Sequence, residues 1–230
     1  MKRVAIITMH DVCNMGAVLQ AYALQQFIIK LGLECEIIDF IPNNRKGFRY
    51  FFPIEKNVSS FRKIGSWIKW FPHRLRWRKQ YSSFRKEHLL VTKKRFYEKG
   101  SLLYKIDLNY DFYITGSDQV WNPASTNGFN PYYFLDFVKS FDKKISYAPS
   151  MSCNCFTPSQ KEEVTYYLKG FKALSAREKT MIPLLNAIYI DAATNPGIVQ
   201  DIEKEPTTTG GGFNAKVEDW NNEVNAEVTI

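Results

Sequence analysis

The residues best suited to chemistry form one short polar stretch, Gly116-Ser117-Asp118-Gln119, which directly follows an apolar run at 110–115. Glycine permits an unusual backbone angle or the close approach of a second chain segment. A strand that ends in an acid and an amide can present both groups at the edge of a sheet, where α/β proteins bind ligands. The alternative is that Asp118 only caps the following turn.

Two further groups could contact a ligand. Asn14 and Gly16 close the turn between a first strand and a first helix, and a helix N-terminus favours an anion. Arg177 follows an apolar run, and its guanidinium could hold a carboxylate or phosphate with two parallel hydrogen bonds, unless it pairs with Glu178. His10 stands in the loop before Asn14, where a lone histidine is more often structural than catalytic.

The elements that must position these residues alternate between strand and helix. A β-branched run at 3–9, a helical spacing of apolar residues up to Gly32 and a second apolar run at 34–40 predict a strand-helix-strand unit. Further strands are predicted at 110–115, 132–138, 143–149 and 172–176, and a capped helix from Thr157. This alternation predicts an α/β fold with a Rossmann-like, doubly wound parallel sheet.

A basic segment interrupts the alternation at residues 45–99. It carries 17 Lys and Arg against three acids, which leaves +14, whereas the whole chain carries +8. Helical spacing covers 58–99, and Pro72 should kink or divide it, with a second helix at 76–88. The charge raises nucleic acid, anionic membranes or phosphorylated substrates as partners, and the alternative is a solvated helical face whose aromatic residues cover the sheet.

Several classes of protein are not indicated. The four cysteines, which include Cys153 and Cys155, lack the spacing of a zinc site and are expected to be free thiols in a reducing cytoplasm. No metal-binding, P-loop or serine-hydrolase motif is present. No secretory signal and no membrane-spanning segment is recognised.

Four stretches taken together resemble the polysaccharide pyruvyl transferase family, in order and in spacing. They are NMGAVLQAYALQ (14–25), DFYITGSDQVWNP (111–123), KKISYAPSMS (143–152) and ALSAREKT (173–180). The resemblance covers about residues 1–180. Met15 stands where the family usually has an aromatic residue, and Ser152 stands where it often has glycine.

The resemblance implies a fold similar to the N-terminal half of a two-domain GT-B transferase. It implies transfer of the enolpyruvyl unit of phosphoenolpyruvate onto two hydroxyls of a sugar, giving a ketal and phosphate, with no cofactor beyond this donor. The acceptor would be a glycan or lipid-linked saccharide of an exopolysaccharide or cell wall. The protein would then be cytoplasmic and peripheral at the inner face of an anionic membrane, and nucleic acid is not expected as a partner.

The resemblance also suggests roles for the polar residues. Asp118 would be the general base on the acceptor, and Arg177 would bind the anionic donor. Asn14, Gly16 and Gly116 would line the cleft. The hydroxyl of Ser117 and the amide of Gln119 would hold the hydroxyls of the acceptor, while Trp121 would be a packing anchor that holds this loop.

The resemblance fades after about Thr180. Residues 181–230 carry eight acids and two lysines, which leaves −6, and are expected to form an atypical, partly disordered tail. Such a tail is too short for a second Rossmann domain of about 100 residues. We therefore expect two regions, 1–180 and 181–230, and weak donor binding by the chain alone. The alternatives are an inactive domain that binds glycan or membrane, and a GT-B glycosyltransferase.

Overall fold

The structure is a computed structural model of the chain and describes residues 1–45, 60–98, 102–105, 107–152, 156–178, 181 and 185. The predicted division at residue 180 and the predicted acidic tail lie almost wholly outside these residues. The elements, in chain order, are β1 (Arg3–Ile7), α1 (Met15–Lys30), β2 (Glu34–Ile37), β3 (Phe40–Ile41), η1 (Asn43–Arg45), α3 (Ser60–His88), β4 (Phe96–Tyr97), η2 (Leu102–Tyr104), β5 (Phe112–Gly116), α4 (Pro123–Thr126), η3 (Pro131–Phe134), η4 (Phe141–Lys143), β6 (Lys144–Tyr147) and α5 (Pro158–Leu168).

Four strands form the main sheet in the order β2-β1-β5-β6, and every neighbouring pair is parallel. The fold is therefore α/β with a parallel sheet, as predicted. Because all strands run the same way, their carboxyl ends meet at one edge. The chain moves outward from β1 to β2 and then returns to place β5 on the other side of β1. The order thus reverses between β1 and β5, which is where open parallel sheets bind ligands.

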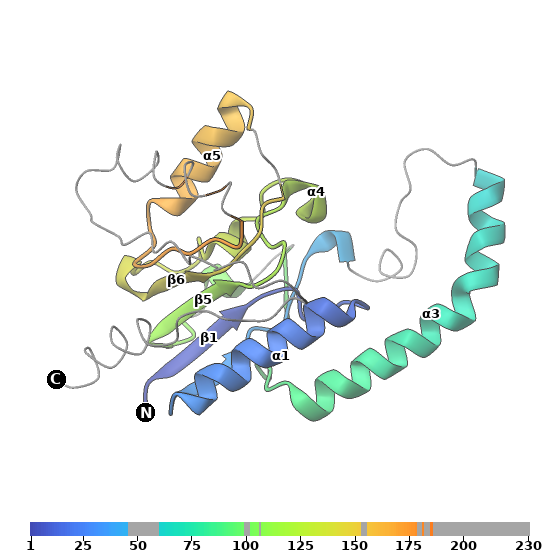
Figure 1. Cartoon of the computed structure of the whole chain (residues 1–230), viewed down its shortest axis with the longest axis horizontal. Helices are drawn as coiled ribbons and strands as arrows, with labels where there is room; N and C mark the ends of the chain where they lie inside the picture. The colour runs from blue at the N-terminus through green and yellow to red at the C-terminus, as the bar shows by residue number, and fades with distance from the viewer. Residues whose placement is uncertain are drawn as a thin grey trace, which may run out of the picture.

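The sheet is covered on both faces. Successive side chains of β1 point to opposite faces, and both sets are buried. Val4 and Ile6 pack in one apolar cluster with Leu24 and Ile28 of α1. Ala5 and Ile7 belong to a second cluster, on the opposite face, with residues of η3 and α5. Figure 1 shows α1 and α5 on opposite sides of the strands. Such two-sided burial explains why β1 is apolar from Val4 to Ile7 rather than alternating with polar residues.

The first helix follows the predicted start and stop signals. The side chain of Asn14 accepts a hydrogen bond from the backbone of Ala17 at 3.1 Å, which caps the N-terminus. The helix ends at Lys30, and Gly32 has φ +82°, a conformation that suits glycine after a helix. The predicted strand-helix-strand unit is therefore confirmed.

The strand predicted at 132–138 is wrong, because this segment forms the short helix η3. Asn130 caps its start by accepting from the backbone of Tyr132 at 3.1 Å, and Pro131 occupies the first helical position. Leu135 ends the turn with φ +55°. The apolar run reflects deep burial against the sheet, which a 3₁₀ turn achieves as well as a strand does.

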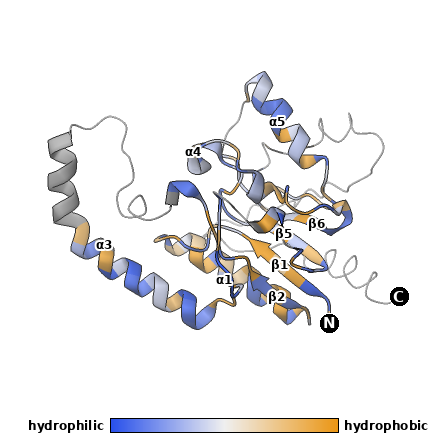
Figure 2. Ribbon diagram, turned by 180° about the vertical axis from the view of Figure 1, so that it is seen from behind, coloured by the Kyte–Doolittle hydropathy of each residue, from blue (hydrophilic) through white to orange (hydrophobic). Residues whose placement is uncertain are grey.

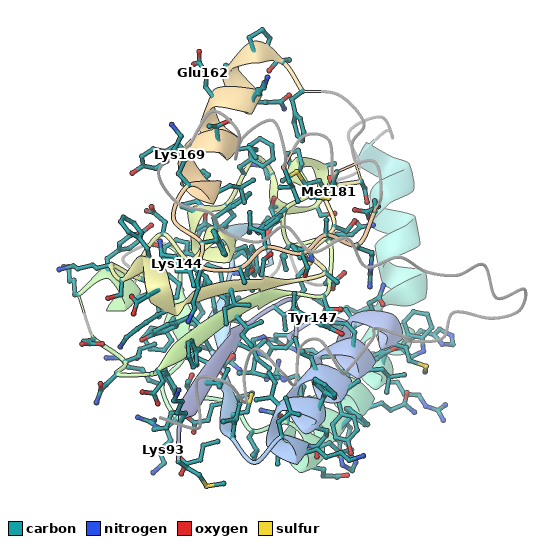
Figure 3. The ribbon with its side chains drawn as sticks, turned by 60° about the vertical axis from the view of Figure 1, so that its left-hand side comes forward. Lys93, Lys144, Tyr147, Glu162, Lys169 and Met181 are labelled. Carbon is teal, nitrogen blue, oxygen red and sulfur yellow. The ribbon has the colours of Figure 1, made fainter. Side chains whose placement is uncertain are left out.

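The remaining predictions after residue 140 hold in part. The strand at 143–149 is confirmed as β6, whose two ends, Lys144 and Tyr147, are labelled in Figure 3. The helix predicted from Thr157 is confirmed as α5, which starts with a capping box between Thr157 and Gln160. The strand predicted at 172–176 is reduced to one parallel bridge between Ala173 and Ile145.

Within the basic segment, Ser60–His88 form one helix, α3, so the second helix predicted at 76–88 is not separate. The helical prediction up to residue 99 is wrong, because the helix ends at His88 and β4 follows. Pro72 lies inside α3, and Figure 1 shows the helix bending between its two halves. After α3 the chain returns to the sheet, where Val91 bridges to Ile37 and β4 pairs in parallel with β3. The prediction that tryptophans of this helix cover the sheet is wrong for Trp77, whose side chain is 52% exposed. Trp67 and Trp70 lie outside the side chains that the structure describes.

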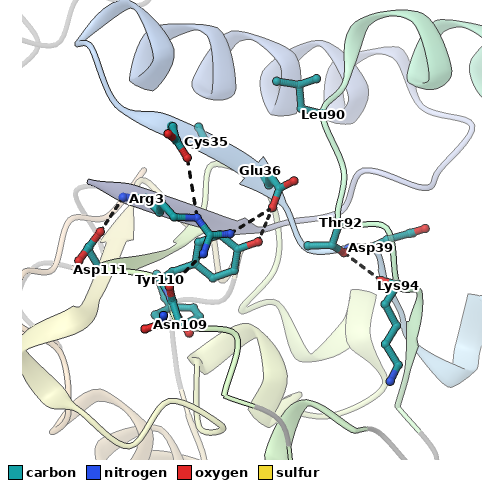
Figure 4. Close-up of polar contacts among 12 residues, drawn as sticks. Arg3, Cys35, Glu36, Asp39, Leu90, Thr92, Lys94, Asn109, Tyr110 and Asp111 are labelled. Carbon is teal, nitrogen blue, oxygen red and sulfur yellow. Dashed lines mark hydrogen bonds and ion pairs between the residues drawn. The ribbon is translucent and has the colours of Figure 1, made fainter. Parts of the chain in front are cut away.

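The opposite, amino edge of the sheet is held by a polar network around Arg3 (Figure 4). Its backbone donates to Asp111 at 2.7 Å, and its guanidinium lies 3.9 Å from Glu36 and over the ring of Tyr110. The hydroxyl of Tyr110 donates to Glu36. Burial and the carboxylate of Glu36 raise the pKa of Tyr110. This edge ties β1, β2 and β5 together and leaves the carboxyl edge as the place for exposed polar loops.

Two of the four cysteines, Cys13 and Cys35, lie within the described part of the chain and are free thiols, as predicted. Cys153 and Cys155 lie outside it. Within the described ranges, no helix combines the length and the apolar character needed to cross a bilayer. Among the same residues, no three metal-ligating side chains come together as a metal site would require.

Candidate active site

The end of β5 bends sharply, because two successive residues adopt positive φ. Gly116 has φ +126° and Ser117 has φ +48°. The backbone of Ser117 donates to the carbonyl oxygen of Tyr147, at the end of β6, at 2.8 Å. A Cβ on Gly116 would come within 2.2 Å of that same oxygen. Gly116 therefore provides both the unusual angle and the close approach that the sequence suggested, and it presents backbone rather than a side chain.

Asp118 follows this bend and is half-buried. One carboxylate oxygen accepts from the backbone of Gln119 at 2.7 Å, so the side chain does cap its own turn. The backbone carbonyl of Asp118 accepts from Ser150 at 2.9 Å, which attaches the loop to the one after β6. Capping through one oxygen and proton transfer through the other are compatible, since a carboxylate has about four lone-pair sites.

Arg177 comes to the same loops from a distant part of the sequence. Its guanidinium donates to the backbone carbonyl of Ser117 at 3.2 Å, and its backbone donates to the carbonyl of Pro149 at 3.2 Å. The predicted alternative, an ion pair with Glu178, is not seen among the described residues. The structure thus brings together three of the predicted site residues: Ser117, Asp118 and Arg177.

Glu178 instead stabilises the loop after β6. One of its oxygens accepts a short hydrogen bond from the buried hydroxyl of Ser150, and the other is buried without a hydrogen-bond partner. The hydroxyl of Ser150 also lies 3.0 Å from that of Ser152, which has φ +50°. Sequence reasoning named Glu178 only as a partner for Arg177, so this second carboxyl group at the site was missed.

Gln119 points back into its own loop. Its side-chain oxygen accepts from Asn122 at 3.2 Å and from Ser125 at 2.9 Å. Only its amide hydrogens are left for a ligand. Trp121 is fully buried, stacks on Phe134 and donates from its indole nitrogen to a backbone carbonyl at 3.0 Å, so its predicted role as a packing anchor is confirmed.

Asn14 and Gly16 lie at the same edge, but after β1 rather than β5. The side chain of Asn14 is used in capping α1, and a Cβ on Gly16 would lie 3.3 Å from that side-chain oxygen. Among the described residues, no hydrogen bond links either of them to the loop of Asp118. They flank the point between β1 and β5 where the strand order reverses, and the helix N-terminus next to it favours an anion.

A buried charged cluster beside this point was missed by sequence reasoning. His10 is fully buried, with one ring nitrogen 3.1 Å from Asp39 and the other 3.3 Å from the carbonyl of Thr8. The other oxygen of Asp39 accepts from Arg95 at 2.8 Å. Burial favours a higher pKa for Asp39, but the hydrogen bonds and charges of His10 and Arg95 outweigh it and hold the pKa below its usual value. The signal available in the sequence was an acid directly after the apolar run of β2.

The fold and these loops define a parallel α/β protein whose polar residues gather at the carboxyl edge, around a reversal of strand order. The chain belongs to the polysaccharide pyruvyl transferase family, whose model matches residues 14–202. The match extends beyond residue 180, where the resemblance was expected to fade. No curated protein and no solved structure matches the chain, so no structural neighbour supports the expected likeness to a GT-B fold.

Proposed function

We propose that this protein transfers the enolpyruvyl unit of phosphoenolpyruvate onto two hydroxyls of a sugar in an exopolysaccharide or cell-wall glycan. One hydroxyl oxygen bonds to C2 of the donor while the methylene carbon C3 gains a proton and becomes a methyl group. The second hydroxyl oxygen then bonds to C2 as the C2–O bond to phosphate breaks. The products are a cyclic ketal and inorganic phosphate, and the two hydroxyl protons go to C3 and to the medium or phosphate.

The observation that carries this proposal is the match of the family over most of the chain, together with the position of its motifs. Two of the motif loops, after β5 and after β6, are joined by the hydrogen bond from Ser150 to Asp118. A third, at Arg177, is joined to both. Motifs that are far apart in sequence thus converge on one edge of the sheet, next to the reversal of strand order.

Asp118 is our candidate for the general base that takes the proton from the attacking hydroxyl. A positioned carboxylate contributes roughly 100- to 10,000-fold to such a step. The side chain is only half-buried and stands on a strained turn, at a strand end. Strained backbone is often found at sites that must hold a reacting group in one orientation.

Arg177 is our candidate for the group that binds the phosphate or carboxylate of the donor. One of its guanidinium nitrogens donates to the carbonyl of Ser117, which fixes the plane of the group. The guanidinium carries five N–H donors, so the remaining ones are available for a bidentate contact with an anion. The N-terminus of α1, with Asn14 and Gly16, would add a favourable field for the same charge.

The test is release of phosphate from phosphoenolpyruvate in the presence of candidate saccharide acceptors, with the ketal detected on the acceptor by mass spectrometry. Asp118→Asn should lower the rate roughly 100-fold or more. Asp142→Asn is the matched control, because Asp142 is an exposed acid in η4, before the start of β6, whereas the loops of the site follow the ends of β5 and β6. Near-normal release by Asp118→Asn would eliminate the base role, and release without ketal formation would eliminate the transfer itself. The location of the protein at the inner face of the membrane stays a prediction.

A further inference from the structure

We propose that the diverging parts of α1 and α3 form a surface that binds bilayers containing anionic lipids. We call it the α1–α3 surface. It consists of Met15 and Leu19 on α1 and Trp77 on α3, with Arg76 and Lys79 as the nearby basic residues. The inference concerns membrane attachment and stands apart from the proposed reaction, because a bilayer can be bound whether or not the site is active.

Among the described side chains, the ring contacts between the two helices lie near the C-terminal end of α3. The ring of Tyr22 meets those of Phe84 at 5.9 Å and His88 at 6.0 Å. Arg85 of α3 also pairs with Asp11, in the loop before α1. Toward the N-terminal half of α3 the helices separate, which Figures 1 and 2 show from opposite sides. The surface begins where their contact ends.

The apolar stripes on both helices continue past this contact. Trp77 stands seven residues, or about two turns, before Phe84 and so lies on the same face of α3. On α1, Leu19 and Met15 precede Tyr22 by three and seven residues and share its face. Each stripe therefore starts in a helix–helix contact and runs on to where the helices have separated.

The side chains on the separated parts are well exposed. The exposed fractions are 64% for Met15, 46% for Leu19 and 52% for Trp77. A gathering of large apolar side chains at one corner of a protein marks an interaction site more often than scattered ones do. Tryptophan and aliphatic side chains beside basic residues are the combination found in helices that lie in the membrane interface.

The charge of α3 indicates which kind of partner fits. Residues 60–86 include nine Lys and Arg and no acid, and Glu87 is the first carboxylate after them. In Figure 2 the described part of α3 is mostly hydrophilic, with single apolar residues between. Such a helix is attracted to an anionic leaflet by about 1 kcal/mol for each Lys or Arg near the surface.

Nucleic acid would also be attracted by this charge, but it fits the apolar residues less well. Binding of single strands relies on aromatic rings that stack on bases. Leu19 and Met15 cannot stack in this way, whereas the interface of a bilayer accepts aliphatic side chains together with Trp77. A bilayer is therefore the partner that uses every exposed group of the surface.

The position of the surface gives it a role. Met15 is the first residue of α1 and directly follows Asn14, which lies at the carboxyl edge of the sheet. Attachment through the α1–α3 surface would bring that edge, and with it the candidate active site, toward the bilayer. The bilayer would then keep an acceptor saccharide carried on a lipid close to the site, which raises the effective concentration of the acceptor there.

The experiment is flotation of the 230-residue chain with vesicles of phosphatidylcholine, alone or mixed with phosphatidylglycerol. We expect binding only to the mixed vesicles and its loss at high salt. Arg76→Glu with Lys79→Glu should lower the partition coefficient about 10-fold or more, since each basic residue contributes roughly fivefold. Lys161→Glu with Lys169→Glu, at an exposed lysine of α5 and at the exposed lysine that caps its C-terminus, is the matched control and should bind as the wild type does.

A second pair of variants tests the apolar part. Leu19→Gln with Trp77→Gln should weaken binding, whereas Tyr166→Gln, which changes a 69% exposed side chain on α5, should not. The blue shift of tryptophan fluorescence on adding mixed vesicles should be smaller in Trp77→Phe. Far-UV circular dichroism confirms that each variant is folded. Equal binding to both kinds of vesicle, equal losses in the α5 controls, or an RNA gel shift without vesicle binding would each overturn the proposal.

Discussion

Gly116 and Tyr147 approach so closely that a Cβ on the glycine would lie 2.2 Å from the tyrosine carbonyl oxygen. The contact joins the carboxyl ends of β5 and β6. It also fixes where the loop of Asp118 leaves the sheet, because the next residue, Ser117, donates to the same oxygen.

Gly116→Ala should therefore be strongly destabilising. The clash is with backbone, which cannot rotate away, and φ +126° is unfavourable for any L side chain. Gly128→Ala is the matched control, since Gly128 has φ +103° but open space around it, and should cost only the strain of roughly 1–3 kcal/mol. Urea unfolding of both variants measures the difference. Equal losses would show that the close contact does not constrain the loop.

Ser152→Gly should be stabilising, although it removes a side chain. Ser152 has φ +50°, a region that costs an ordinary residue roughly 1–2 kcal/mol. The gain is offset in part by the greater freedom of glycine in the unfolded chain and by the loss of the contact with Ser150. We expect a net gain of about 0.5 kcal/mol, read from the urea midpoint. Ser159→Gly, inside α5, is the control and should lose stability instead.

The buried cluster of His10, Asp39 and Arg95 should make stability depend on pH in the acid range. Because the pKa of Asp39 is lower in the folded state, its contribution is fully present above about pH 4, the unfolded value, and is lost as the pH falls through the folded pKa. Asp39→Asn should cost about 3 kcal/mol at neutral pH and flatten this acid dependence. Unfolding curves between neutral and acid pH measure both.

The control for that experiment is Asp142→Asn, at an exposed acid. It should leave both the stability at neutral pH and the acid dependence nearly unchanged. If Asp39→Asn retained the full acid dependence of the wild type, other carboxylates would be responsible for it.

Arg177→Lys should weaken donor binding while the fold persists. An ammonium group cannot donate to Ser117 and also form a bidentate contact with an anion. We expect kcat/KM for phosphoenolpyruvate to fall roughly 10- to 100-fold, the value of a charged hydrogen bond. Arg76→Lys on α3 is the matched control and should have no effect on it. An unchanged kcat/KM would remove Arg177 from the donor site.

The sequence predicted the elements whose periodicity and boundary signals agree. For α1, the cap at Asn14 and the stop at Gly32 both bracket the helical spacing, and β1 is a short β-branched run followed by a polar loop. The aromatic run at 132–138 carried no such agreement. Burial alone is shared by strands and buried 3₁₀ turns, and the local signal of Asn130 and Pro131 decided the conformation.

The candidate site was predictable only where a residue follows a strand. Ser117 and Asp118 follow β5, Arg177 follows the predicted strand that the structure reduces to a bridge at Ala173, and the structure brings the three together. Arg95 could not be recognised, because it stands among many other basic residues and its partner Asp39 is 56 positions away. A charge run gives no indication of which member is buried against an acid. That choice depends on tertiary packing.

The return of the chain after α3 has a consequence for the evolution of this protein. Asn43 donates from its backbone to Glu98 at 2.7 Å, and β3 and β4 pair in a two-stranded sheet of their own, so the long segment between them leaves and rejoins the fold at neighbouring points. The segment that contains α3 can therefore differ between homologous proteins without changing the register of any strand in the main sheet. Changes in this segment would alter where a homologous protein is located in the cell, while the loops around Asp118 keep their positions.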